Sequence, residues 1–153
     1  MGKTLLETAD IIQEMHSNIV GVKKAPYLKE YPRGELNDMD FPMVLVYPET
    51  AQWNNPFGIG CKSEKRVWRV VCIIASPNEG VMFEALEKAV NLIDEIGKTY
   101  NDASNSLMTD GDGDLLIEIT EEYPNDSGFD DELVHADTIY YGFTFNLLVW
   151  RKA

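Results

Sequence analysis

The chain has 153 residues, a length that suits a single domain spanning 1–153. Its 13 basic and 26 acidic residues give a net charge of −13, which excludes ordinary binding of nucleic acid through a basic surface and disfavours docking on anionic lipid. A hydrophobic content of 44% argues against an intrinsically disordered chain, and two cysteines are too few for a disulfide-rich scaffold.

The first predicted element is an amphipathic helix. Thr4 and Glu7 form a capping box, and apolar residues then recur at helical spacing up to Ile19, where Gly21 ends the pattern. This start lacks an apolar signal run, so we expect no signal peptide. No stretch reaches the length of a membrane span, and we therefore expect a soluble protein with no membrane contact.

Two strands joined by a long arm are expected next. Phe41 to Tyr47 is a short apolar run that Pro48 closes, and Val67 to Ala75 is rich in β-branched residues. The two strands are predicted to pair as a hairpin whose arm, Glu49 to Lys65, is unusually long for a compact domain.

The arm carries two large aromatic residues, Trp53 and Phe57. Two helices already serve the core, so these side chains are predicted to anchor a protein interface. The alternative is a satellite cluster that folds the arm back onto the sheet.

A second, longer helix is predicted from Pro77 to about Tyr100. Ser76 and Glu79 form the start signal, with Pro77 at the first helical position. The apolar stripe that should face the sheet consists of Met82, Ala85, Leu86, Ala89, Val90, Ile93, Ile96 and Tyr100.

The C-terminal part is predicted to add two strands. Leu115 to Thr120 alternates like a half-exposed strand, Tyr123 to Asp137 is expected to be an acidic loop, and Ile139 to Val149 has a strong alternating pattern. Gly142 in the last strand indicates a bulge or a close backbone approach. The order α-β-β-α-β-β predicts an α+β fold, with one four-stranded, mostly antiparallel sheet, two helices packed on one face and a long β-hairpin arm.

The charge is unevenly distributed. Residues 1–78 hold 9 basic and 9 acidic side chains, whereas residues 79–153 hold 4 basic and 17 acidic ones. This acidic part is either a solvated face or a surface that repels polyanions or meets a basic partner. Asp110 to Asp114 resembles a calcium loop, but Leu115 stands where the sharp turn needs glycine, so a plain acidic turn is favoured and no metal site is predicted.

No group of residues argues for catalysis. His16 and His135 lack a nearby nucleophile motif and are expected to be structural or exposed, and Cys72 is expected to be a small core residue. The paired carboxylates lie in predicted solvated loops, which lack the burial that tunes a pKa for acid–base chemistry. We expect no enzyme activity and no cofactor.

The layout resembles a known family. The segment Tyr31 to Pro42 followed by the strand Met43 to Tyr47, and the later strand Trp68 to Ala75 with its capped helix and final aromatic strand, resemble tail terminator or tail completion (neck) proteins of tailed bacteriophages. The resemblance covers most of the chain in layout and rests on size, element order and acidity more than on a signature motif.

The resemblance implies a virion structural protein of the tail and neck, assembled in the host cytoplasm. Such proteins form a ring, commonly hexameric, that caps the tail tube, stops its growth and joins it to the head–tail connector. The partners would be further copies of the chain, the tail tube protein and the connector protein, with DNA passing through the lumen without specific binding. An acidic lumen wall would repel phosphates.

Two sets of residues fit such a ring. The acidic residues predicted to face the lumen are Asp110, Asp112, Asp114, Glu121, Glu122, Asp126, Asp130, Asp131 and Glu132. The basic residues that either meet the acidic half of the next subunit or merely solubilise the hairpin are Lys62, Lys65, Arg66 and Arg69. Two other functions stay open, namely another neck component such as a head-completion protein and an acidic DNA-mimic inhibitor.

Overall fold

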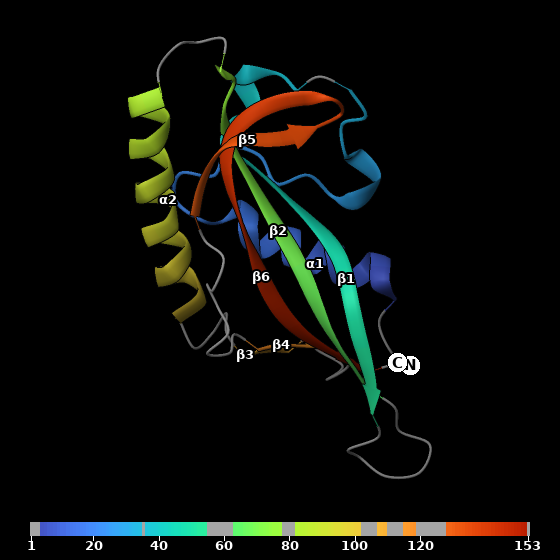
Figure 1. Cartoon of the computed structure of the whole chain (residues 1–153). Helices are drawn as coiled ribbons and strands as arrows, with labels where there is room; N and C mark the ends of the chain where they lie inside the picture. The colour runs from blue at the N-terminus through green and yellow to red at the C-terminus, as the bar shows by residue number, and fades with distance from the viewer. Residues whose placement is uncertain are drawn as a thin grey trace.

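The computed structural model describes residues 4–34, 36–54, 63–77, 82–101, 107–109, 115–118 and 128–152. This part of the chain forms two α-helices and an antiparallel sheet, which confirms the predicted α+β class (Figure 1). In chain order the elements are α1 (Leu5–Ser17), the 3₁₀ turns η1 (Leu28–Glu30) and η2 (Asp38–Asp40), β1 (Met43–Asn54), β2 (Ser63–Ala75), α2 (Met82–Asn101), β3 (Leu107–Thr109), β4 (Leu115–Glu118), β5 (Gly128–His135) and β6 (Thr138–Lys152).

The sheet has a four-stranded antiparallel body in the order β1-β2-β6-β4. Two further strands that the sequence pattern did not predict extend it to six, because β3 pairs with β4 and β5 pairs with β6. β5 lies within the segment Tyr123 to Asp137, which was predicted to be an acidic loop. Its charged residues hide the apolar alternation that marks a strand, and pairing with the long β6 supplies the hydrogen bonds instead.

The strands of the β1–β2 hairpin are longer than predicted. β1 does not end at Pro48 but continues to Asn54, and β2 begins at Ser63. β1 is an edge strand in the described sheet, so the N–H that proline lacks is not needed there, and a register shift between Pro48 and Ala51 absorbs the irregularity. The connecting residues 55–62 lie outside the described part, so a projecting arm stays a prediction.

Both helices pack on one face of the sheet, in a core shared by α1, α2 and alternate residues of β1, β2 and β6. Figure 1 shows α1 crossing behind the long strands and α2 running along their side. The predicted capping box at the start of α1 is present, with Thr4 and Glu7 joined by hydrogen bonds of 3.1 and 3.2 Å. The described part of α2 begins at Met82, and the predicted start from Pro77 runs through residues 78–81, which lie outside it.

The opposite face of the sheet is covered by the segment that precedes β1 and by the β5–β6 hairpin. The backbone N–H of Leu36 donates to the Tyr140 hydroxyl at 2.9 Å, and the rings of Phe41 and Tyr140 meet edge to face at 5.7 Å. The predicted alternation of β6 holds for most of its length, but Ile139, near the hairpin tip, is exposed.

Gly142 marks the predicted close approach of two backbones. A Cβ at this position would overlap the backbone carbonyl of Cys72 on β2, so a side chain cannot be accommodated without moving the strand. The β2–β6 register shifts at the same place, between Ile73 and Ala75, which confirms the bulge that the glycine indicated.

The inner half of the β1 edge is capped by side chains and by one neighbouring carbonyl. Val44 donates its N–H to the Lys24 carbonyl at 3.0 Å and accepts from the Gln13 amide at 2.8 Å. The Tyr31 hydroxyl accepts from the Val46 N–H at 2.7 Å and donates to the Val46 carbonyl at 2.8 Å. Since an uncapped strand edge invites pairing with another chain, these contacts close half of the edge against aggregation.

Replacing this cap should destabilise the fold. Tyr31→Phe leaves both polar groups of the buried Val46 backbone without the hydroxyl, and we expect the free energy of unfolding to fall by about 2 kcal/mol in urea titrations. Tyr27→Phe is the matched control, because the Tyr27 side chain is exposed, and should change stability by less than about 0.5 kcal/mol. Equal effects of the two substitutions would contradict the capping role.

Candidate functional site

The basic residues of the hairpin do not form one patch. Successive residues of a strand point to opposite faces, so Lys65 and Arg69 share one face of β2 and Arg66 lies on the other. Lys62 lies outside the described residues. The three described cations are therefore placed in two different environments.

Arg66 belongs to a buried charged group on the helical face. The carboxylate of Glu64, 1% exposed, accepts from Arg66 at 2.7 and 2.9 Å and from Arg151 of β6 at 3.0 Å. Arg66 also donates to the Glu49 carbonyl at 2.6 Å, beside the irregularity of β1. This group joins β1, β2 and β6 at the outer end of the sheet.

Glu64 is held in its charged form. Burial alone raises the pKa of this carboxyl, but the hydrogen bonds from Arg66 and Arg151 and their positive charges outweigh burial and lower the pKa below its ordinary value. With two guanidinium groups around one carboxylate, the arrangement is structural, since both cations are already used within the chain.

Lys65 and Arg69 lie over aromatic rings on the opposite face. The Lys65 ammonium lies 5.6 Å from the centre of the Trp150 ring, and the Arg69 guanidinium lies 5.2 Å from the centre of the Tyr47 ring. Arg69 also forms an ion pair with Glu49, with 3.4 Å between Nε and the carboxylate. Both side chains are partly exposed, so they can still contact another molecule.

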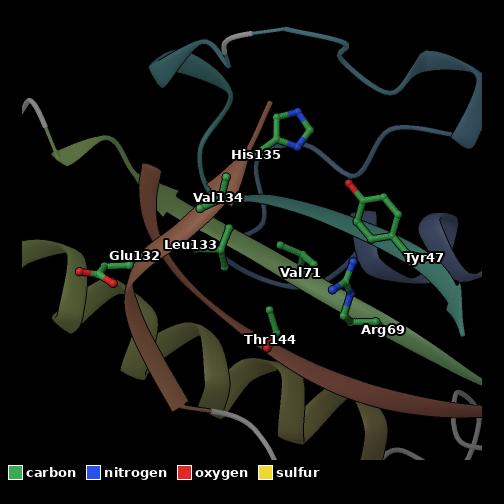
Figure 2. A pocket seen from close by; sticks show the side chains of 8 residues that line it. All are labelled: Tyr47, Arg69, Val71, Glu132, Leu133, Val134, His135 and Thr144. Carbon is green, nitrogen blue, oxygen red and sulfur yellow. The ribbon is translucent and has the colours of Figure 1, made fainter. Parts of the chain in front are cut away.

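Arg69 lines a pocket of about 320 Å³ on this face (Figure 2). Tyr47, Arg69 and Val71 form one wall, and residues of β5 from Glu132 to His135 form the other. In Figure 2 the Arg69 guanidinium lies beside Tyr47, while the Glu132 carboxylate points away from it. The pocket is the one described place where a partly exposed cation, a phenol and an imidazole line the same hollow.

His16 is buried in a chain of hydrogen bonds between the helices and β1. The Gln13 amide donates to the carbonyls of Pro26 and Val44, both at 2.8 Å, so its oxygen must accept from His16 Nδ1, 3.1 Å away. His16 Nε2 is then the acceptor for the Tyr100 hydroxyl of α2. Burial lowers the pKa of His16 to about 3, so the ring is neutral and structural.

The other residues singled out in the sequence divide between core and undescribed positions. Cys72 is buried in the core as predicted, and burial raises the pKa of its thiol. The backbone of Trp53 lies in β1, but its side chain is not among the described ones, and Phe57 lies outside the described residues.

Most of the acidic residues also lie outside the described part, namely Asp110, Asp112, Asp114, Glu121, Glu122 and Asp126. Asp130 and Asp131 lie in β5 with side chains that are not described, and Glu132 is exposed. Among the described residues no group of three or more His, Cys, Asp or Glu side chains is placed to hold a metal ion. Within that same part, no helix is long and apolar enough to cross a membrane.

One exposed surface was missed in the sequence. The predicted stripe of α2 was expected to face the sheet, but its buried side consists of Ala85, Ala89, Leu92, Ile96 and Tyr100. Phe83, Leu86 and Val90, at positions i, i+3 and i+7, are 76, 39 and 57% exposed and lie on one side of the helix. The apolar arc of α2 is thus wider than the sheet covers, and we call these three residues the α2 apolar stripe.

A second apolar site lies at the tip of the β5–β6 hairpin. Val134 and Ile139 face each other across the strands and are both exposed. The turn between them places Ala136 and Asp137 at positive φ, the turn geometry that matches the twist of paired strands. This hairpin covers the sheet face opposite the helices, so the tip and the α2 apolar stripe belong to different layers of the molecule.

No protein-family model matches the chain, and no curated protein matches it in sequence.

The buried carboxylate predicts a large mutational effect. Glu64→Gln leaves two guanidinium groups without their counter-charge, and we expect the free energy of unfolding to fall by about 3 kcal/mol. Glu49→Gln, which removes the same charge from an exposed site on β1, should change it by less than about 1 kcal/mol. Denaturant titrations at neutral pH measure both, and a small effect at Glu64 would contradict the buried group.

The neutral imidazole predicts a pH dependence. Between about pH 6.5 and 3 the unfolded chain binds a proton at His16 that the folded chain does not, so the free energy of unfolding decreases as the pH falls. From pH 7.5 to 5 this residue should remove about 2 kcal/mol. His16→Gln should flatten that slope, and an unchanged slope in this variant would refute the assignment.

Proposed function

We propose that this protein is a non-enzymatic structural subunit that assembles head to tail with copies of itself into a closed ring. More specifically, we propose a ring, commonly hexameric, at the head-proximal end of a bacteriophage tail. This ring would terminate the tail tube and join it to the head connector. In this role the protein belongs to the virion, is assembled in the host cytoplasm, needs no cofactor and lets DNA pass through its lumen.

The main observation in support of a ring is that one subunit has two different exposed apolar sites, which lie on different layers. A closed ring of identical copies uses heterologous contacts, in which one surface of each copy meets a different surface of the next. The α2 apolar stripe and the pair Val134 and Ile139 supply two such surfaces. Single exposed apolar residues are ordinary, but a stripe along two turns of a helix is typical of an interaction site.

Burial of the stripe would supply part of the free energy of association. Full burial of a side chain such as valine, leucine or phenylalanine contributes about 1.5–3 kcal/mol relative to exposure. The α2 apolar stripe has three such side chains, two of them more than half exposed. Its burial against a neighbour would therefore contribute several kcal/mol, to which charged contacts add specificity and register.

The placement at a phage tail is supported by the resemblance of the segment from Tyr31 to Pro42 and of the final aromatic strand, together with the α+β class. An acidic lumen, formed by the C-terminal acids from Asp110 to Glu132, and tail-tube contacts of Trp53 and Phe57 are parts of the same proposal. A DNA mimic would need its carboxylates alone and has no use for the α2 apolar stripe, so the ring is the better explanation.

Assembly of the purified chain tests the proposal. Native mass spectrometry and sedimentation, with and without tail tubes, should detect a closed oligomer, because some rings of this kind form only when they dock. Val90→Glu should raise the concentration for half assembly by about tenfold or more. The adjacent exposed Asn91→Glu adds the same charge to the same helix and should leave assembly nearly unchanged.

Two results would refute the ring. One is a monomer at high concentration both alone and with tail tubes. The other is an oligomer that forms equally well with Val90→Glu and with Asn91→Glu, since the α2 apolar stripe would then lie outside the contact.

A further inference from the structure

The geometry points to the pocket beside Arg69 as a receptor for a carboxylate side chain supplied by a second copy of this chain. The inference rests on the proposed ring and deepens it, because it names the charged contact between neighbouring subunits. Three observations support the inference, namely the contacts that hold Arg69, the shape of the pocket and the charge of the chain.

The Arg69 side chain is held in place, but some of its N–H donors remain available. The Tyr47 ring supports the guanidinium, and the ion pair with Glu49 engages Nε. A guanidinium has five N–H donors, and the described contacts of Arg69 leave those on the two terminal nitrogens available. The side chain is half-exposed, so an incoming group can reach these donors. A planar, supported fork of this kind matches the two oxygens of a carboxylate.

The pocket suits a side chain from another chain. Its volume of about 320 Å³ is at the lower end of the range for small-molecule sites and is open to solvent on one side. Val71 and Leu133 give it apolar walls, Tyr47, Thr144 and His135 add polar groups, and Glu132 adds a carboxylate at the β5 wall. Figure 2 shows the Arg69 guanidinium beside Tyr47 and Val71, at the wall of the hollow opposite β5. A carboxylate there would meet the guanidinium, with apolar contacts for its methylene groups.

Charge complementarity indicates the source. Residues 79–153 carry 17 acidic and 4 basic side chains, so a second copy contains carboxylates in large excess. A partly exposed arginine in a hollow is the complementary group on a chain with a net charge of −13. Glu49, already beside Arg69, and Glu132, which lines the opposite wall, both repel an incoming carboxylate. The contact therefore sets register and encounter rate more than affinity.

Position-specific cross-linking tests the inference. Arg69→Lys places a primary amine in the pocket, and carbodiimide then joins it to any carboxylate in direct contact. Light and isotopically heavy chains are mixed before assembly, so that mass spectrometry separates links between copies from links within one copy. We expect a light–heavy link from position 69 to an acid in residues 79–153. Arg33→Lys, at an exposed site of the same original charge, is the control and should give no such link.

Assembly and ligand titrations complete the test. Arg69→Gln should raise the concentration for half assembly by about tenfold at low salt, and less at high salt, whereas Arg33→Gln should change it less than about twofold. Succinate, a free dicarboxylate, should at high concentration compete with assembly of the unaltered chain. Circular dichroism establishes that the variants remain folded.

The outcomes separate the two proposals. A ring that forms normally without a light–heavy link from position 69 overturns the receptor and leaves the ring standing. Tight succinate binding that depends on Arg69 but does not affect assembly assigns the pocket to a free ligand and also overturns it. A chain that stays monomeric with and without tail tubes overturns both proposals.

Discussion

The fold depends on one constraint, that the inner half of β2 is buried on both faces. Alternate side chains must enter two different layers, with Val70 and Cys72 in the helical core and Val71 and Ile73 in the opposite cluster. The pairing of β2 with β6 holds this register along the strand. Further out the same alternation separates charges, because it directs Glu64 and Arg66 inwards and Lys65 and Arg69 to the other face. The face of β2 on which a basic residue lies thus decides whether it forms a buried ion pair or stays accessible to another molecule.

Several buried polar groups between the layers are matched to specific partners. The hydrogen bonds from Tyr100 through His16 to Gln13 tie α2 and α1 to β1, and burial keeps the imidazole neutral. The Tyr31 hydroxyl likewise forms hydrogen bonds with the N–H and the carbonyl of Val46 at the edge of β1. An unpaired buried polar group is strongly unfavourable. These contacts therefore restrict the relative positions of the layers more than apolar packing alone could. They also make the inner half of the β1 edge a poor place for association, whereas α2, the hairpin tip and the Arg69 pocket stay exposed in the described part.

The site and the proposed assembly follow from surfaces that the fold leaves uncovered. α2 has an apolar arc wider than the sheet can bury, and a monomer gains nothing from Phe83 and Val90 in water. The pocket beside Arg69 likewise presents donors that no described side chain engages, on a chain whose other half is rich in acceptors. Both features are understandable if the functional unit is larger than one chain.

The sequence by itself determined the helices, the long strands, the α+β class, the capping box at Thr4 and the special place of Gly142, because these depend on local spacing and backbone freedom. It also indicated that His16 and Cys72 are not reactive groups. Tertiary structure alone decided that β5 is a strand, that β1 continues through Pro48, and that Leu86 and Val90 face water. It also decided that Arg66 is ion-paired with the buried Glu64, whereas Arg69 is half-exposed and keeps donors available. The physical reason is that edge position, coverage of a helix face and partners distant in sequence are properties of packed layers, and no local pattern contains them.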